Sequence, residues 1–473
     1  MFNKLLFQKV DNSSLIIFRI FFGILISLEC FGAIATGWVR RNLIDPKYNF
    51  PFIDFDWLHP LPGPGMYFYF SLMGLLGLCI AFGFKYRVSI ITFTLLWTAT
   101  YLMQKTAYNN HYYLLILISL LMCFFPAEKA KSIDVKLNPK LETNYMYSYV
   151  KWTIVLQLFI VYVYASFAKI YIDWLDFSMI EVLMHPRRNY WLIGEVLQQP
   201  WVHTIIGTAG ILFDLLIIPA LLWKPTRKAA FLISIFFHLF NSFIFQIGIF
   251  PYLALAFSVF FFGPETIRSI FFKSKEPFTS FNKIVVPNYK NNLLLLMWIY
   301  FIVQLLLPVR HYVIEDNILW TEEGHRMSWR MMLRSRVGKG HFKIVDKNTG
   351  QLIKIIPKNY LTTSQERKVF AYPDFAWQFA QYLKMDFENK NMDVAVYLED
   401  SQISINGKPY MPFLDSTTDL AAEPWKPLKH HNWILPSNFK ELMNYTRISQ
   451  FSDKVEAESP KDLVTLPDDY HLP

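Results

Sequence analysis

Long runs of apolar residues recur over the first two-thirds of the chain. Several approach the roughly 20 residues that an α-helix needs to cross a bilayer, which predicts membrane-spanning helices. The runs cover residues 13–36, 66–83, 88–104, 111–125, 148–169, 203–222, 229–247, 250–262 and 292–307. Only a bend at Gly248 and Pro251 separates the seventh run from the eighth, so the pattern predicts eight or nine spans. The first run has no small-residue cleavage site behind it, and we expect a retained helix there.

The pattern changes after residue 307, where turn signals and short alternating runs replace the long apolar ones. This pattern predicts a small α+β domain over residues 308–449. Its expected elements are a hairpin over 341–356 that turns at "DKNTG", a helix over 364–385, and a second hairpin over 393–412. Asn406-Gly407 is a strong two-residue turn signal for the second hairpin. From residue 450 to 473 the chain is charged and poor in apolar residues, which predicts a loose tail.

The predicted fold is therefore a polytopic α-helical membrane bundle over residues 1–307, followed by a smaller extracytoplasmic α+β domain. The orientation follows from the flanks of the runs. Lys and Arg concentrate on the flanks that lie inside if the N-terminus is cytoplasmic, and cytoplasmic loops carry such an excess. With nine spans, the region after residue 307 then lies on the outer side of the membrane.

Composition agrees with a membrane protein. The chain of 473 residues is 53% hydrophobic and 18% charged, whereas soluble domains carry about a quarter charged residues. The net charge of +9 is spread over the loops and not gathered on one face, so we expect no nucleic-acid partner. The three cysteines fall within apolar runs and the histidines are scattered, which predicts neither a disulfide framework nor a metal site.

Lys169 is the most prominent candidate for chemistry, because ionisable residues within spans are costly and usually functional. It ends the fifth run, on the same face of the bundle as His111 at the start of the fourth. An apolar setting disfavours the ammonium form, so Lys169 could act as a base near neutral pH. The alternative is a lysine whose side chain only reaches back to the membrane interface.

Other polar residues in the spans have both functional and structural interpretations. His111, behind Asn109 and Asn110, could stabilise a developing oxyanion, or the group could cap a helix. His238 and Asn241 share one helix face and could instead bond between helices. We expect structural pairing for three further residues: Asp214 with a polar neighbour, and Arg19 and Glu29 in ion pairs with other spans. These residues favour an apolar cofactor or lipid substrate without identifying a reaction.

Five motifs together carry a family resemblance. They occur in the order "TAYNNHYYL", "FAKIYIDWLDFSM", "FHLFNSFIFQIGIFPY", "RMSWRMMLRSR" and "QISINGKPYMPFLDSTTDLAAEPWKPL". The chain resembles the vitamin K-dependent γ-glutamyl carboxylase family from residues 16–23 to 432–436, as a short member with an HTTM-type transmembrane domain. Short relatives of this kind look microbial, which implies a bacterial inner membrane with the active site on the extracytoplasmic face.

The resemblance implies a definite reaction. In this family a lysine deprotonates reduced vitamin K, here phylloquinol or menaquinol. The deprotonated quinol reacts with O2 to generate a strong base. This base removes a γ-proton of glutamate, and CO2 then adds to the resulting carbanion. The products are γ-carboxyglutamate and the quinone 2,3-epoxide, and no metal takes part. The implied partners are a quinone from the bilayer and a Glu-containing exported protein or peptide.

By motif match, the resemblance also assigns residues. It implies Lys169 and His111 as catalytic residues, Asn110, His238 and Phe250 as quinone-binding residues, and Trp320, Ser328 and Arg336 as substrate-binding residues. An arginine suits the last role because its fork matches a carboxylate. The sequence departs from the family pattern at Arg334, where a histidine is expected, and at His185, where an arginine is expected. Two alternatives stay open: a quinol epoxidase or monooxygenase without carboxylation, and a non-catalytic lipid-binding or transport protein.

Overall fold

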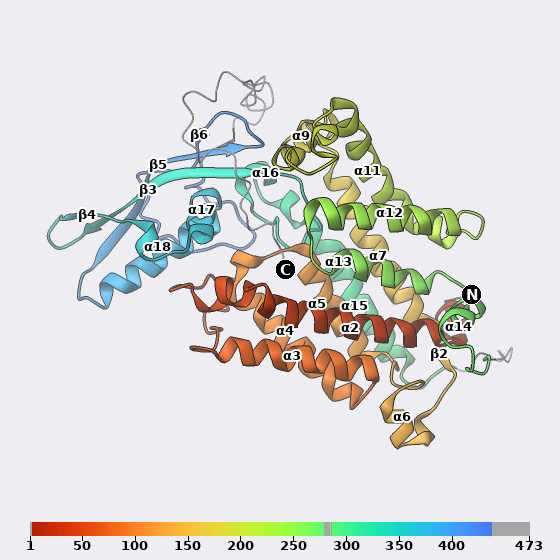
Figure 1. Cartoon of the computed structure of the whole chain (residues 1–473). Helices are drawn as coiled ribbons and strands as arrows, with labels where there is room; N and C mark the ends of the chain where they lie inside the picture. Colours follow the sequence, from red (N-terminus) through yellow and green to blue (C-terminus); the bar gives the residue numbers. More distant parts are fainter. Residues whose placement is uncertain (1, 279–283, 285, 438–473) are drawn as a thin grey trace.

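The computed structural model describes residues 2–278, 284 and 286–437. A helical bundle makes up most of it, and a smaller domain with a β-sheet lies at one end of the bundle (Figure 1). The elements β2 and α14 lie at the opposite end of the bundle. The tail predicted for residues 450–473, and the last residues of the predicted domain from 438, lie outside the described residues.

A helix forms in each of the nine apolar runs. The helices are α2 (Ser13–Ala35), α3 (Gly65–Phe82), α4 (Tyr86–Met103), α5 (Asn110–Phe124), α7 (Ser148–Ala168), α11 (Pro200–Leu222), α12 (Arg227–Phe245), α13 (Phe250–Ala256) with the 3-10 helix η5 (Phe257–Phe260), and α15 (Lys290–Val309). Among the described residues, six are long and apolar enough to cross a membrane: α2, α3, α7, α11, α12 and α15. The helical bundle is thus confirmed, whereas the predicted count of eight or nine spans is confirmed only as far as these six.

Short elements connect the long helices. Before α11 they are α1 (Phe2–Phe7), β1 (Lys9–Asp11), η1 (Arg40–Ile44), η2 (Lys105–Ala107), α6 (Ile133–Leu137), η3 (Pro139–Leu141), β2 (Tyr145–Tyr147), α8 (Ile172–Leu175), α9 (Ser178–Met184), η4 (His185–Arg187) and α10 (Gly194–Leu197). After α13 they are α14 (Pro264–Phe271), η6 (Arg310–Val313) and α16 (Ile318–Thr321). Strands β1 and β2 pair antiparallel and bring the start of the chain beside α7.

Helices α2 and α3 approach each other closely through two glycines. A Cβ atom on Gly23 would lie 2.4 Å from the backbone nitrogen of Ala81, and one on Gly77 would lie 2.9 Å from the carbonyl oxygen of Gly23. Small residues allow such approach between helices in membranes, where van der Waals contact is a main source of association. The α2–α3 pair therefore depends on the absence of side chains at these positions.

The predicted bend between α12 and α13 is present. Helix α12 is followed by Gln246, with φ of 50°, and Gly248 has φ of 60°. Both residues are in the left-handed region, which a continuing right-handed helix cannot contain. Pro251 lies in the first turn of α13, where its missing N–H costs nothing. The seventh and eighth apolar runs are therefore separate helices.

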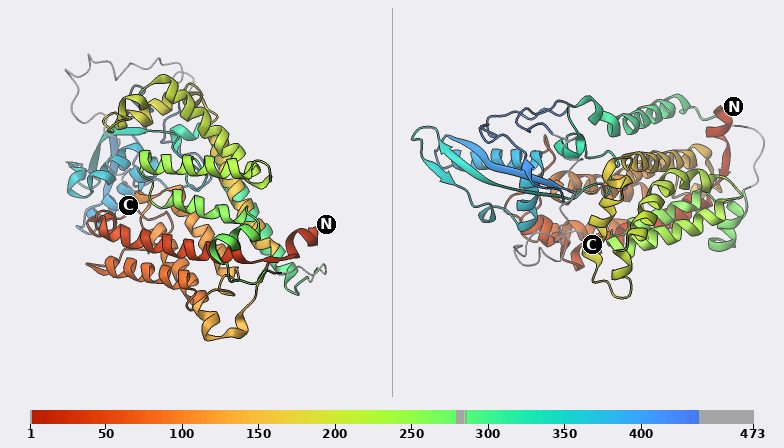
Figure 2. Two further views of the ribbon diagram at one scale, coloured as in Figure 1. Left: turned by 45° about the vertical axis from the view of Figure 1, so that its right-hand side comes forward. Right: turned by 90° about the horizontal axis from the view of Figure 1, so that it is seen from above.

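The smaller domain contains a four-stranded antiparallel sheet in the order β4-β3-β5-β6 (Figures 1 and 2). Its strands are β3 (Arg336–Asp346), β4 (Leu352–Lys354), β5 (Val394–Ile405) and β6 (Met411–Pro412). Both predicted hairpins are confirmed: β3 pairs with β4, and β5 pairs with β6. Asn406 and Gly407 have φ of 55° and 73°, as the tight turn at the end of β5 requires.

The helix predicted over 364–385 is wrong as a single element, because two helices form there. These are α17 (Thr363–Ala371) and α18 (Pro373–Glu388), which follow the 3-10 helix η7 (Pro357–Asn359). Pro373 lacks the N–H that a continuous helix needs, and Tyr372 before it is extended. Both helices pack on the sheet and share its core with Phe342, Val369, Phe375, Phe379 and Val396.

Buried ion pairs fasten the smaller domain to the bundle. Asp374 on α18 pairs with Lys105, which follows α4, and with Arg326 at 2.8 Å. Burial alone would raise the pKa of Asp374, but the adjacent Arg326 and Lys105 cations lower it to about 2. Asp173, on α8 just after α7, accepts hydrogen bonds of 2.8 Å from Lys408 and from Asn406. The sheet domain is thus held against the ends of α4 and α7.

A Gly23→Ala variant tests the close approach of α2 and α3. The added Cβ would meet backbone atoms that cannot move independently, and such overpacking typically costs about 1–3 kcal/mol. Gly32→Ala is the matched control on the same helix, because a Cβ there meets nothing within 4 Å. Thermal unfolding in detergent should show a lower Tm for Gly23→Ala than for Gly32→Ala. Equal Tm values would contradict the role of Gly23.

Candidate functional site

Lys169 lies directly after α7 and is buried, with an exposed fraction of 7%. Its Nζ forms an ion pair with Asp214 of α11, whose exposed fraction is 6%. Nζ also donates to the carbonyl of Ala165 at 3.3 Å and lies 5.3 Å from the centre of the Trp174 ring. A lysine that merely reaches the interface would be solvated. Burial and the ion pair therefore contradict that alternative.

Asp214 is the acidic partner that the sequence left unidentified. The expectation that it would pair with a polar neighbour is confirmed, and that neighbour is the candidate base itself. Among the described residues, Asp214 makes no other side-chain hydrogen bond. A proton on Nζ therefore has one carboxylate within reach, and the two groups can share it in surroundings where water is scarce.

A cluster of aromatic rings surrounds His111 and His238. The His111 ring stacks on Phe250 with 3.8 Å between ring centres, and His238 meets Phe250 edge to face at 6.1 Å. The Nε2 atom of His238 is 3.2 Å from the hydroxyl of Tyr162. The Nδ1 atoms of both histidines are buried without a hydrogen-bond partner among the described residues. The cluster thus offers two unsatisfied ring nitrogens.

The lysine pair and the histidine cluster are connected through α7 and α11. Lys169, the residue that caps the C-terminus of α7, follows Tyr162 of that helix by seven positions, which places both on one face. On α11, Phe213 lies beside Asp214 in sequence and meets the His238 ring edge to face at 5.6 Å. Within the described part of the chain, Lys169 and His111 make no direct contact. The two groups are neighbouring parts of one buried polar region.

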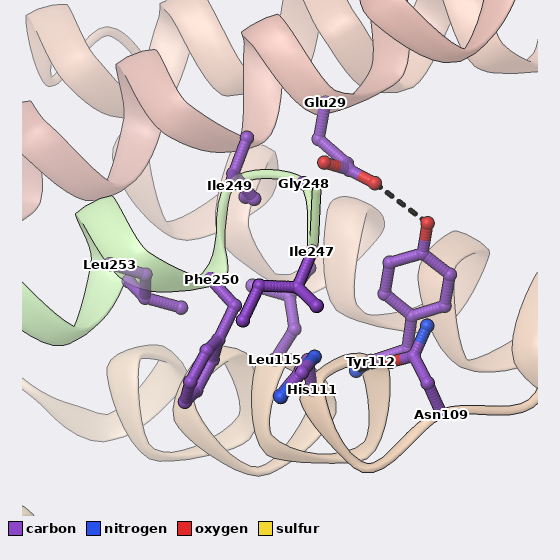
Figure 3. A pocket seen from close by; sticks show the side chains of 10 residues that line it. All are labelled: Glu29, Asn109, His111, Tyr112, Leu115, Ile247, Gly248, Ile249, Phe250 and Leu253. Carbon is purple, nitrogen blue, oxygen red and sulfur yellow. Dashed lines mark hydrogen bonds between the residues drawn. The ribbon is translucent and has the colours of Figure 1, made fainter. Parts of the chain in front are cut away.

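A small cavity lies between α2, α5 and the connection from α12 to α13 (Figure 3). It is lined by Glu29, Asn109, His111, Tyr112, Leu115, Ile247, Gly248, Ile249, Phe250 and Leu253. The carboxylate of Glu29 accepts a 2.7 Å hydrogen bond from the Tyr112 hydroxyl across it. The cavity measures about 20 Å³, which is room for one water molecule but not for a quinone ring.

A wider groove of about 640 Å³ adjoins the other side of the same connection. Half of its lining residues are aromatic, and Trp191 among them is 84% exposed. Its lining comprises Asn189, Tyr190, Trp191, Leu239, Ser242, Phe243, Gln246 and Tyr252. Neighbouring residues of this connection thus line both spaces: Gln246 lines the groove, and Ile247 to Ile249 line the cavity at His111.

Asn110 connects this region to the smaller domain. Its amide nitrogen donates to the carbonyl of Arg330 at 3.2 Å, and its amide oxygen accepts from Tyr108 at 2.9 Å. Asn110 therefore points toward the segment that joins bundle and sheet. Its position next to His111 in sequence keeps it at the edge of the histidine cluster.

Of the three residues predicted to hold substrate, Trp320 and Arg336 are in contact near the start of β3, Ser328 contacts Arg310, and each is engaged internally. The Trp320 indole donates to Leu435 at 2.8 Å, and the Ser328 hydroxyl donates to Gly324 at 2.6 Å. Arg336 donates to three carbonyls and lies 3.6 Å from a Glu322 oxygen. Trp320 and Ser328 are also almost fully buried. In this conformation their polar atoms face protein groups.

Comparison with family models covers both parts of the chain. The model described as "HTTM domain" matches residues 7–265, and the model described as "Vitamin K-dependent gamma-carboxylase, lumenal domain" matches residues 289–440. The chain belongs to the vitamin K-dependent γ-carboxylase family. No solved structure matches it. Membership of this family and the apolar helices identify a multi-pass membrane protein and support an enzyme.

Two expectations about charged residues in the spans of this carboxylase-family chain are wrong. Arg19 forms no ion pair among the described residues; it donates to the carbonyls of Ala127, Ala130 and Lys131. Glu29 bonds to the Tyr112 hydroxyl instead of a cation. In both cases the hydrogen-bond partners are neutral groups: loop carbonyls for the Nη atoms of Arg19 and a hydroxyl for Glu29.

A double-mutant cycle tests the buried pair. Lys169→Met and Asp214→Leu each leave one charge without its partner, which typically costs about 3–5 kcal/mol, whereas the double variant removes both charges. The free energies of unfolding should therefore be strongly non-additive. Lys343 and Glu399 on the sheet are the matched control, because their side chains are 31% and 42% exposed and such pairs couple by about 1 kcal/mol or less. Additive costs for Lys169 and Asp214 would contradict the pairing.

Proposed function

We propose that this protein carries out vitamin K-dependent γ-carboxylation of glutamate residues in proteins, coupled to oxygenation of reduced vitamin K to the 2,3-epoxide. The observation that carries the proposal is the buried Lys169–Asp214 pair, at the end of the bundle to which the family's lumenal domain is fastened. The substrates would be phylloquinol or menaquinol, O2, CO2 and a Glu-containing exported protein or peptide. Three other described lysines are buried beside a carboxylate, but those carboxylates lie outside the six long apolar helices: Lys105 with Asp374, Lys275 with Asp11 and Lys408 with Asp173.

The residues of the His111 cavity fit an aromatic ring with oxygen substituents. The unpartnered Nδ1 atoms of His111, which lines the cavity, and of His238, which lies edge-on to Phe250, would hydrogen-bond those oxygens beside the stacked His111 and Phe250 rings. When bound, the hydroquinone supplies, through its reaction with O2, a base strong enough to remove a γ-proton of glutamate, which no side-chain base can do. Because the cavity is small, the connection at Gly248 would have to move to admit the ring.

Lys169 would act on a proton of the bound hydroquinone. Its Nζ must be neutral to accept that proton, and Asp214 is placed to take the proton that Nζ releases. The apolar walls formed by Leu115, Ile247 and Leu253 would keep water away from the reactive groups. Asn110, at the edge of the cluster, would help to position the ring with His238.

The open aromatic groove suits the hydrophobic tail of a lipid quinone. It adjoins the cavity through the connection at Gln246, so a tail there could follow a ring that enters past Phe250. Peptide would reach the site from the side of the sheet domain. The charge of the flanking loops supports a cytoplasmic N-terminus, which would place the sheet domain outside a bacterial inner membrane.

One observation favours a second candidate, quinol oxygenation without glutamate carboxylation. Trp320, Ser328 and Arg336, the residues assigned to the substrate by family resemblance, have their polar groups bonded within the protein. If no other residue receives the glutamate, the chain would oxidise quinol alone. The test of function must therefore follow both products.

The decisive assay supplies reduced vitamin K or menaquinol, O2, labelled bicarbonate and a Glu-containing peptide to the purified full chain. We expect quinone epoxide and label fixed in peptide. Lys169→Ala should lower both by about 100-fold or more, in line with the usual contribution of a positioned base. Lys151→Ala, at the other end of the same helix α7, is the matched control and should keep activity.

The remaining outcomes separate the alternatives. Epoxide without fixed label would favour the quinol oxygenase. Absence of both products from folded wild-type protein would contradict both enzymatic proposals and leave the non-catalytic lipid-binding or transport protein.

A further inference from the structure

Arg330 differs from the other arginines near the junction of the two domains. Five arginines occur between residues 310 and 336: Arg310, Arg326, Arg330, Arg334 and Arg336. Arg310 donates to the carbonyls of Leu307 and Arg326, and Arg326 pairs with Asp374. Arg334 and Arg336 both face Glu322. Among the described residues, the Arg330 side chain makes no hydrogen bond or ion pair, and its Nε atom is buried without a partner.

The backbone of Arg330 contacts the edge of the candidate site. Its own carbonyl accepts the hydrogen bond from Asn110, the residue before His111. Three residues further on, the carbonyl of Leu333 accepts a hydrogen bond from the Tyr171 hydroxyl, two residues after Lys169. The short stretch from Arg330 to Leu333 therefore bridges the ends of α5 and α7, the two helices that carry His111 and lead to Lys169.

The surroundings of Arg330 carry more positive than negative charge. Two carboxylates pair with four cations there. Glu322 pairs with Arg334 and Arg336, and Asp374 pairs with Arg326 and Lys105. Burial, together with nearby Arg334, lowers the pKa of Arg330 to about 10, so the guanidinium stays charged at neutral pH. The nearby carboxylate of Glu322 partly offsets the charge of Arg330, but Glu322 is bonded to Arg334 and lies 3.6 Å from Arg336. A partly buried cation with no carboxylate bonded to it is costly, and an arriving anion would reduce that cost.

We propose that Arg330 binds the γ-carboxylate of the acceptor glutamate. A guanidinium fork can hold a carboxylate through two parallel hydrogen bonds, which fixes both its position and its orientation. A carboxylate neutralised in this way also weakens the repulsion that opposes charge on the neighbouring γ-carbon. The proposal rests on the proposed function, and it gives the substrate a receptor that Arg336, bonded to carbonyls, does not provide.

Binding of a labelled peptide to the full chain in detergent tests the proposal. The probes are a Glu-containing peptide and the same peptide with Gln in place of Glu. Fluorescence anisotropy measures the binding of each. Hydrogen bonds to charged groups predict that wild type binds the Glu peptide about tenfold or more tightly. Arg330→Gln should lose that preference, and Arg330→Lys should keep part of it. Arg367→Gln removes an exposed arginine of α17 as the matched control and should bind as wild type does.

Several results would overturn the proposal. One is that folded Arg330→Gln keeps the wild-type preference for the Glu peptide over the Gln peptide. Another is that Arg330→Gln binds both peptides more weakly by the same factor. A competition experiment with bicarbonate alone gives a further test. If bicarbonate displaced the Gln peptide as readily as the Glu peptide, the site would be assigned to a free anion. Because the titration needs no quinol and no turnover, its result stands whether or not wild-type protein forms product, so failure here and failure of the proposed function are distinct.

Discussion

One buried carboxylate holds the three parts of the molecule together. Asp374 belongs to the sheet domain, Lys105 to the bundle, and Arg326 to the segment between them, and the three meet within the protein. Asp374 also lies in the first turn of α18, where a helix favours negative charge. Because a buried charge must be paired, this junction fixes where the segment from Arg326 to Arg336 crosses the ends of α5 and α7.

The chemistry proposed for the site follows from that placement. The bundle contributes a buried lysine with its carboxylate and two histidines with unsatisfied nitrogens. The crossing segment adds Arg330, whose backbone carbonyl accepts a hydrogen bond from Asn110. A lipid ring that enters from the groove at Trp191 and a peptide that arrives beneath the sheet would therefore meet at one closed region. In this proposal, neither part of the chain contains the whole site.

The sequence predicted what depends on local pattern. Apolar runs predicted the helices, and Asn406-Gly407 predicted a turn. Lys169 became a candidate because an ionisable side chain within a membrane span is energetically costly. Pairing between distant segments was not visible in the same way. Asp214 is 45 positions from Lys169, and only the folded structure brings the two side chains together. The one hint of this pairing in the sequence was a single acidic residue in a neighbouring span. The Arg330 side chain lacks a hydrogen-bond partner among the described residues because the nearby carboxylates bond to other cations. The local sequence pattern does not predict which residues pair in this way.

Hydrogen exchange at the γ-carbon of glutamate tests the central claim most directly, because it reports proton removal without the later addition of CO2. A Glu-containing peptide would be incubated with the protein in D2O without CO2, and deuterium at the γ-carbon measured by mass spectrometry. The account predicts incorporation only when both reduced vitamin K and O2 are present, and none with Lys169→Ala. Incorporation without the quinol, or undiminished incorporation by Lys169→Ala, would contradict it.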